Sequence, residues 1–134
     1  PLVCGRYINK SEIEKPTEST WRTERYLFLS EFDDPVITAH HLDDVVEWWI
    51  FSSMRGNPNL TPIHRADVKV IRPFLLSRQS ELHDKFREYP CIEDPTNAET
   101  AHTRNFIRHE IVPRVLKINP GLHNTIKNLY NSSE

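Results

Sequence analysis

The segment Pro35–Gly56, PVITAHHLDDVVEWWIFSSMRG, constrains the fold of this 134-residue chain more than any other. It opens with a short β-branched run behind a proline, a pattern typical of a strand. Over Leu42–Met54 the apolar residues recur at helical spacing. The sequence therefore predicts a strand over residues 35–39, a tight turn, and a helix over residues 42–54.

The predicted turn carries four polar side chains: His40, His41, Asp43 and Asp44. Open α/β sheets bind ligands at the carboxyl ends of their strands, and the N–H groups at a helix N-terminus attract phosphate. Two acids in a first helical turn also suit a purely structural role, because a cap stabilises a helix by about 0.5–2 kcal/mol. Both interpretations stay open at this point.

The rest of the chain continues an α/β pattern. A weak strand is expected over residues 1–8 and a clearer one over residues 68–71, which ends at Pro73. Such short strands, with helices between them, indicate a Rossmann-like parallel sheet with flanking helices and a helical C-terminal segment. The further helices are expected over residues 15–32, 77–89, 98–112 and 119–130, with a possible kink at Pro113.

Composition and sequence patterns exclude several classes of protein. The net charge of −2 is not that of a whole nucleic-acid-binding domain, so any RNA contact must be local. No apolar run has the length of a membrane span, and the first residues lack the layout of a signal peptide, so we expect a cytoplasmic protein with no membrane contact. The two cysteines form no CxxC motif, and no metal-binding spacing of histidines occurs, so no protein metal site is predicted.

The three glycines, Gly5, Gly56 and Gly121, are far apart. A phosphate-binding loop needs several backbone N–H groups brought together by small residues. The sequence contains no such loop.

Two helical features have competing explanations. Arg104 and Arg108 lie four residues apart, where like charges repel, so a compensating anion is expected. Either Glu110 and other local carboxylates supply that anion, or a phosphate does. Trp48 and Trp49 can stack on nucleobases, but their apolar neighbours favour core packing for at least one of them.

Several motifs follow one another along the chain in a recognisable order. They are HHLDD with Glu47, Arg55-Gly56, Ile71-Arg72-Pro73, Glu93-Asp94-Pro95-Thr96-Asn97, Arg104-Asn105-Phe106-Ile107-Arg108 and Val112-Pro113, preceded by Glu18, Arg22 and Arg25-Tyr26. This order and spacing resembles the tRNA(Ile)-lysidine synthetase family of PP-loop ATP pyrophosphatases.

The resemblance implies a fold and an activity. The fold would be adenine nucleotide alpha hydrolase-like, with residues 1–97 as a partial PP-loop ATPase-type domain and residues 98–134 as its helical extension. The implied enzyme is a ligase that uses ATP and Mg²⁺ to adenylate the wobble cytidine of a tRNA, after which free lysine displaces AMP.

The resemblance also implies roles for particular residues. The catalytic candidates are His41, Asp44, Arg104 and Arg108; His40, Asp43 and Asn105 would contact the nucleotide, and Arg22, Arg25 and Arg55 would contact RNA.

The chain departs from the family in two places. The SGGxDS-type phosphate loop is absent, and Trp48 stands where a small polar residue is usual. Three hypotheses follow: a ligase fragment or subunit whose loop comes from a missing N-terminal segment or a second chain, an inactive relic, or an RNA- or protein-binding module. On the first hypothesis the chain begins midway through a βαβ series, and alone it would lack activity and self-associate through an open sheet edge.

Overall fold

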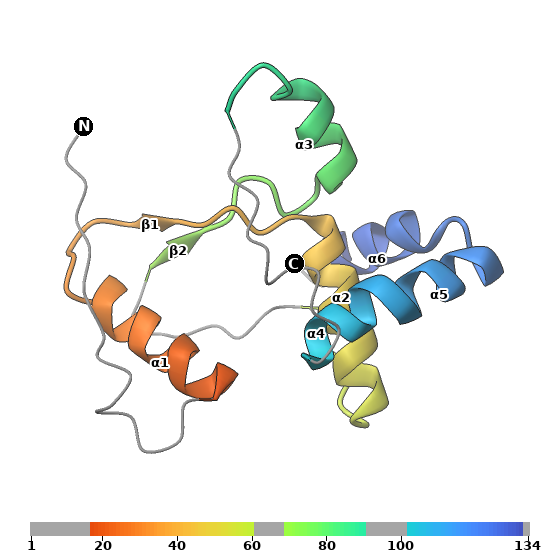
Figure 1. Cartoon of the computed structure of the whole chain (residues 1–134), viewed down its shortest axis with the longest axis horizontal. Helices are drawn as coiled ribbons and strands as arrows, with labels where there is room; N and C mark the ends of the chain where they lie inside the picture. Colours follow the sequence, from red (N-terminus) through yellow and green to blue (C-terminus); the bar gives the residue numbers. More distant parts are fainter. Residues whose placement is uncertain (1–16, 61–68, 91–101, 133–134) are drawn as a thin grey trace. The chain divides into compact units, whose positions relative to one another are not determined.

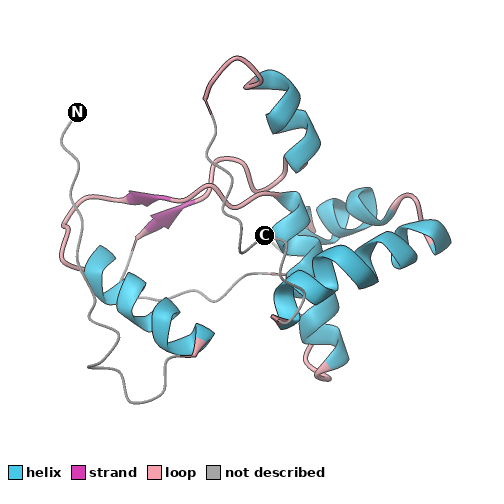
Figure 2. Ribbon diagram, in the orientation of Figure 1, coloured by secondary structure: helices cyan, strands magenta, loops and turns pink. Residues whose placement is uncertain are grey.

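We describe the protein from a computed structural model, which covers residues 17–60, 69–90 and 102–132. The chain divides into two compact units, residues 1–37 with 65–71, and residues 38–64 with 72–134. Figure 1 traces the elements along the chain, and Figure 2 shows that helices outnumber strands among them. Each unit is described by itself.

The first unit contains helix α1 (Glu18–Leu29) and strands β1 (Val36–Ile37) and β2 (Val70–Ile71). The strands pair in parallel, Val36 with Val70 and Ile37 with Ile71. This confirms a parallel pairing, but β1 is shorter than the predicted 35–39. Continued pairing would bring β1 opposite Pro73, which has no N–H to donate.

Helix α1 begins at Glu18, inside the predicted range of residues 15–32, and ends early. Thr17 caps it, because its hydroxyl accepts a hydrogen bond from the N–H of Thr20 at 3.2 Å. The predicted end near Phe32 is wrong, since the helix ends at Leu29 and the hydroxyl of Ser30 bonds back to the Leu27 carbonyl. This side-chain bond competes with helix continuation.

The second unit is a cluster of helices around α2 (Leu42–Met54). Its other elements are α3 (Gln79–Lys85), α4 (Thr103–Phe106), the π-helical segment η3 (Ile107–Ile111), α5 (Val112–Ile118) and α6 (Leu122–Asn131). Helix α2 contacts both α6 and η3, as Figure 1 shows. The buried core consists of Leu42, Val45, Val46, Ile50, Leu75, Ile107, Leu122 and Ile126.

Helix α2 has the bounds that the sequence predicts. Its core residues Val45, Val46 and Ile50 are buried, which is the periodicity that predicted the helix. At the other end Gly56 has φ +77°, a left-handed conformation that favours glycine after a helix.

Elements α4, η3 and α5 follow one another without a break, beyond the predicted end at residue 112. Where the sequence predicts an irregularity at Pro113, the five residues Ile107–Ile111 are π-helical, and the Val112 N–H bonds to the Ile107 carbonyl. A proline ring clashes with the carbonyl four residues earlier in a regular helix, and a wider turn relieves that clash.

Helix α3 begins and ends differently from the prediction. It begins after Arg78 rather than Ser77, because the Glu81 carboxylate accepts a hydrogen bond from the Arg78 N–H at 2.8 Å. It ends at Lys85 rather than Tyr89, and Phe86 and Tyr89 are exposed.

The expected strand over residues 1–8 and the Glu93–Asn97 motif lie outside the described residues. None of the helices in the described ranges has the length and apolarity that crossing a membrane requires.

Candidate functional site

The candidate site is built on the N-terminal turn of α2. His41 is the N-cap residue in an extended conformation, and its backbone N–H donates to Oδ2 of Asp44 at 2.9 Å. The Leu42 N–H donates to the Ser77 carbonyl at 2.8 Å. The start of the helix is therefore fixed by the Asp44 side chain and by the chain leading into α3.

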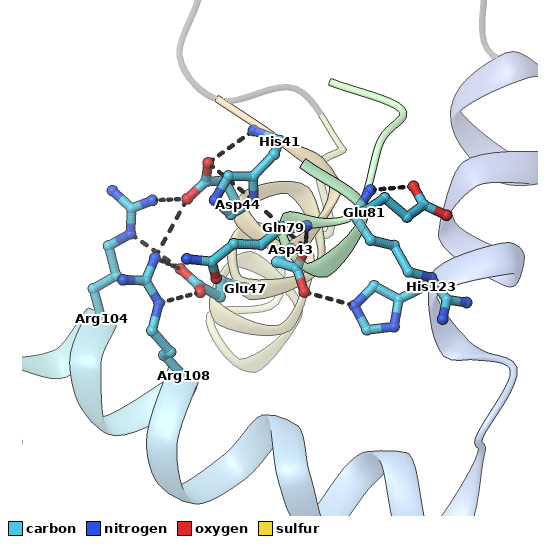
Figure 3. A network of polar contacts seen from close by, with 10 residues as sticks. His41, Asp43, Asp44, Glu47, Gln79, Glu81, Arg104, Arg108 and His123 are labelled. Carbon is cyan, nitrogen blue, oxygen red and sulfur yellow. Dashed lines mark hydrogen bonds and ion pairs between the residues drawn. The ribbon is translucent and has the colours of Figure 1, made fainter. Parts of the chain in front are cut away.

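Asp43 connects three elements. Its carboxylate accepts a hydrogen bond from the Gln79 N–H at 2.7 Å, and its other oxygen lies 3.0 Å from Nε2 of the buried His123 in α6. Nδ1 of His41 lies 3.5 Å from the same carboxylate. Figure 3 shows these side chains converging from α2, α3 and α6.

A four-residue ionic cluster occupies the opposite side of the same turn; it consists of Asp44, Glu47, Arg104 and Arg108. Nε and Nη2 of Arg108 lie 2.6 and 3.2 Å from the two Glu47 carboxylate oxygens. Nε of Arg104 lies 3.1 Å from Glu47, and its Nη2 donates to Asp44. Nη2 of Arg108 also reaches Asp44 at 3.4 Å (Figure 3).

The two acids are buried and the two arginines are partly open. The side chains of Asp44 and Glu47 are 9% and 4% exposed, whereas those of Arg104 and Arg108 are 40% and 26% exposed. A buried carboxylate is stable only when it is paired and hydrogen-bonded, and the arginine forks provide both. The two carboxylates and the two guanidinium groups balance one another in charge.

The surroundings shift three pKa values. Burial opposes the charge on Arg104, but Asp44 and Glu47 outweigh it and raise the pKa of the guanidinium. Burial would raise the pKa of Asp43, but the nearby His41 imidazole and hydrogen bonds from Gln79 and His123 hold that pKa well below its usual range.

The His41 imidazole favours its charged form. Burial alone would lower its pKa, but the Asp43 carboxylate 3.5 Å away and the charges of Asp44 and Glu47 together raise it. The surroundings of His41 thus favour the protonated imidazole more than water does.

The structure brings His41, Asp43, Asp44, Arg104 and Arg108 to one end of α2. His40, also predicted, lies beside them in the chain, and its Nδ1 is 2.9 Å from the Thr38 hydroxyl. Asn105 is half-buried in α4 between the two arginines.

The arginines predicted to contact RNA belong to other elements than the turn that carries the site. Arg22 and Arg25 belong to α1 in the first unit, half-buried and exposed respectively. Arg55 follows the last residue of α2 and stacks on Phe51, with its guanidinium carbon 5.3 Å from the ring centre.

Three residues of the site had no role in the sequence prediction: Glu47, Gln79 and His123. Asp44 and Glu47 are spaced three apart, and Arg104 and Arg108 four apart, so two complementary helix faces were present in the sequence. Glu110 was the named local candidate for the anion, but it pairs with Arg114 at 2.6 Å.

The donor set at this site does not fit a magnesium ion. Mg²⁺ needs oxygen ligands with near-octahedral geometry. The carboxylates of Asp44 and Glu47 are engaged by guanidinium groups, and within the described ranges no three His, Cys, Asp or Glu side chains are grouped to hold a metal.

Comparison with known sequences identifies the family of the chain. The PP-loop domain family matches residues 4–115, so the chain belongs to that family. It is 35% identical to the tRNA(Ile)-lysidine synthase of Thermotoga sp. (strain RQ2), over 95% of this chain and 36% of the relative.

Two other relatives carry the same name. The tRNA(Ile)-lysidine synthase of Lactiplantibacillus plantarum is 38% identical over 90% of this chain and 30% of its own length. That of Haemophilus ducreyi is 30% identical over 92% of this chain and 33% of its own length. The chain spans about a third of the length of these relatives.

Proposed function

We propose that the chain forms part of an ATP-dependent ligase of the tRNA(Ile)-lysidine synthase type. PP-loop domains bind ATP, and the relatives' name specifies a tRNA and a lysine-containing product. The observation that carries the proposal is the ionic cluster, in which three of the four predicted catalytic residues meet, with His41 beside them.

The proposed reaction has two steps. The C2 oxygen of the wobble cytidine attacks the α-phosphorus of ATP, and the bond to pyrophosphate breaks. The amine of lysine then attacks C2, the C2–O bond breaks, and AMP leaves.

Within this scheme Arg104 and Arg108 neutralise phosphate. Fixed cations accelerate such a step because negative charge grows on the leaving group, and a planar guanidinium suits phosphate oxygens. Their forks are already oriented by Glu47 and Asp44, so little side-chain entropy is lost when phosphate approaches.

His41 and Asp44 orient the phosphate or the cytidine. A protonated His41 would add a further cation beside the arginines, 3.6 Å from the Asp44 carboxylate.

The competing proposal is a binding module or relic that retains only the scaffold. It is favoured by one observation: both arginines are paired with carboxylates, which is a sufficient structural reason for their presence. In that case the cluster stabilises the helices and nothing more.

The test is an ATP-dependent lysine-incorporation assay on tRNA(Ile). The chain is co-expressed with a polypeptide that carries an SGGxDS-type loop, since this sequence contains none. We expect activity from the pair, loss of at least tenfold in Arg108→Gln, and no change in the matched exposed variant Arg114→Gln. A folded complex of the chain with the loop-carrying polypeptide that shows no activity would contradict the ligase proposal and favour the binding module.

A further inference from the structure

A second site lies further along the same side of α2. Residues three or four positions apart share a helix face, and Trp48, Ser52 and Arg55 follow Asp44 in successive steps of four, four and three positions. Together with Phe51, Asn57 and Asn59 they line a hollow of about 250 Å³. None of these residues takes part in the ionic cluster.

The walls of this hollow are aromatic. The rings of Trp48 and Phe51 are 5.7 Å apart at a tilt of 43°, and the Arg55 guanidinium lies over the Phe51 ring. Aromatic faces and a stacked arginine are the groups on which unpaired nucleobases stack.

The loop after α2 is fixed as one side of the hollow. The Ser52 hydroxyl accepts a hydrogen bond from the Asn59 N–H at 2.9 Å. Two carbonyl oxygens lie within reach of its own proton, that of Trp49 at 3.1 Å and that of Asn59 at 3.2 Å. This side chain is buried, so the loop is held against the helix. The side-chain amide of Asn57 offers both a donor and an acceptor to the edge of a base.

We propose that this hollow binds one unpaired nucleobase of an RNA strand. Its volume is below the roughly 300–1,000 Å³ of sites for drug-sized ligands, which suits a fragment the size of a base. The described lining residues include one cation and no acid, so a neighbouring phosphate meets attraction and not repulsion. An aromatic side chain of a protein partner would stack on the same rings, but it brings no phosphate for the Arg55 guanidinium to attract.

The site gives a function to three residues that the ionic cluster does not use: Trp48, Phe51 and Arg55. A nucleobase in this hollow would lie near the C-terminal end of α2, about two helical turns beyond Asp44. The chain as a whole has a net charge of −2, so an RNA contact confined to one place agrees with its composition.

The test measures binding of a fluorescein-labelled hexauridylate to the purified chain by fluorescence anisotropy, with neither ATP nor lysine present. We expect Trp48→Leu to raise Kd about tenfold and Trp48→Tyr to restore most of the affinity. Arg55→Gln should raise Kd about threefold. The controls are Tyr89→Leu, an exposed aromatic residue, and Arg87→Gln, an exposed arginine; both should stay within twofold of the unmodified chain.

A hexamer with the same backbone and no bases separates stacking from phosphate attraction. It should bind the unmodified chain about tenfold more weakly, with no further loss in Trp48→Leu. Equal affinity for both hexamers, or equal losses in Arg87→Gln and Arg55→Gln, would overturn the proposal.

No binding of hexauridylate at all, with an aromatic peptide bound instead, would also overturn it. If Trp48→Leu fails to fold by circular dichroism, the abasic comparison and Arg55→Gln decide the matter alone. Because ligase activity is not measured here, this test and that of the proposed function fail independently.

Discussion

The second unit contains two kinds of ion pair with the same chemistry and different surroundings. In the ionic cluster, Glu47 is 4% exposed and is bound by two arginines. In the surface pairs, Arg114 with Glu110 and Arg87 with Asp84, the side chains are 40–72% exposed. Water screens the surface pairs almost completely, whereas the buried acids depend on their partners. The comparison shows that burial, and not the number of ion pairs, decides which charges this fold requires.

The largest expected effect follows from removing one buried charge. Glu47→Gln leaves two guanidinium groups facing an amide, so we expect the free energy of unfolding to fall by about 3 kcal/mol. Urea denaturation followed by circular dichroism measures this. The matched control Glu110→Gln removes a surface acid and should cost under about 0.5 kcal/mol. Equal losses in the two variants would mean that burial does not distinguish the pairs.

A double-mutant cycle sharpens the same comparison. Because Glu47 and Arg108 touch at 2.6 Å in a partly buried site, Glu47→Ala and Arg108→Ala should be coupled by about 2 kcal/mol. The cycle on Glu110 and Arg114, also 2.6 Å apart, should give about 0.3–0.5 kcal/mol, because the two side chains are exposed. A coupling near zero for Glu47 with Arg108 would contradict the account.

The ion pairs of His41 and Asp43 predict how stability depends on pH. The pKa of His41 is raised by folding, so its contribution is complete below about pH 6.5 and is lost as pH rises through the folded-state value. The pKa of Asp43 is lowered, so its contribution is present above about pH 4 and is lost as pH falls. Both contributions coexist between those values.

Thermal unfolding from pH 4 to 8 tests this dependence. His41→Gln should flatten the decline above pH 6.5, and the exposed His83→Gln should leave it unchanged. A decline that persists in His41→Gln would assign it to another group.

The smallest effect is expected at the other surface pair. Asp84 and Arg87 lie 2.9 Å apart with about 70% of each side chain exposed. Asp84→Asn should therefore change the free energy of unfolding by less than about 0.5 kcal/mol, measured by urea denaturation, and added salt should abolish any difference. A loss above 1 kcal/mol would show that exposure is a poor guide to the strength of these pairs.

The sequence predicted local features well and distant partnerships poorly. The bounds of α2 follow from short-range spacing, and the structure confirms them. The anions for Arg104 and Arg108 lie 57–64 residues away in the chain, so helical spacing around the arginines offered only local carboxylates such as Glu110, or a phosphate. The strand lengths also depend on pairing between distant segments, which the alternation in one segment does not determine.

Arg108→Lys tests whether the ionic cluster serves catalysis, as we propose, in addition to stability. Lysine keeps the charge beside Glu47 but loses the planar fork. Lysine incorporation into tRNA(Ile) and the free energy of unfolding are measured on the same loop-complemented preparation, with Arg114→Lys as the matched control. The account predicts that Arg108→Lys loses at least tenfold in activity beyond any loss of folded protein, and that Arg114→Lys loses neither. Activity that falls only in proportion to the folded fraction would contradict it.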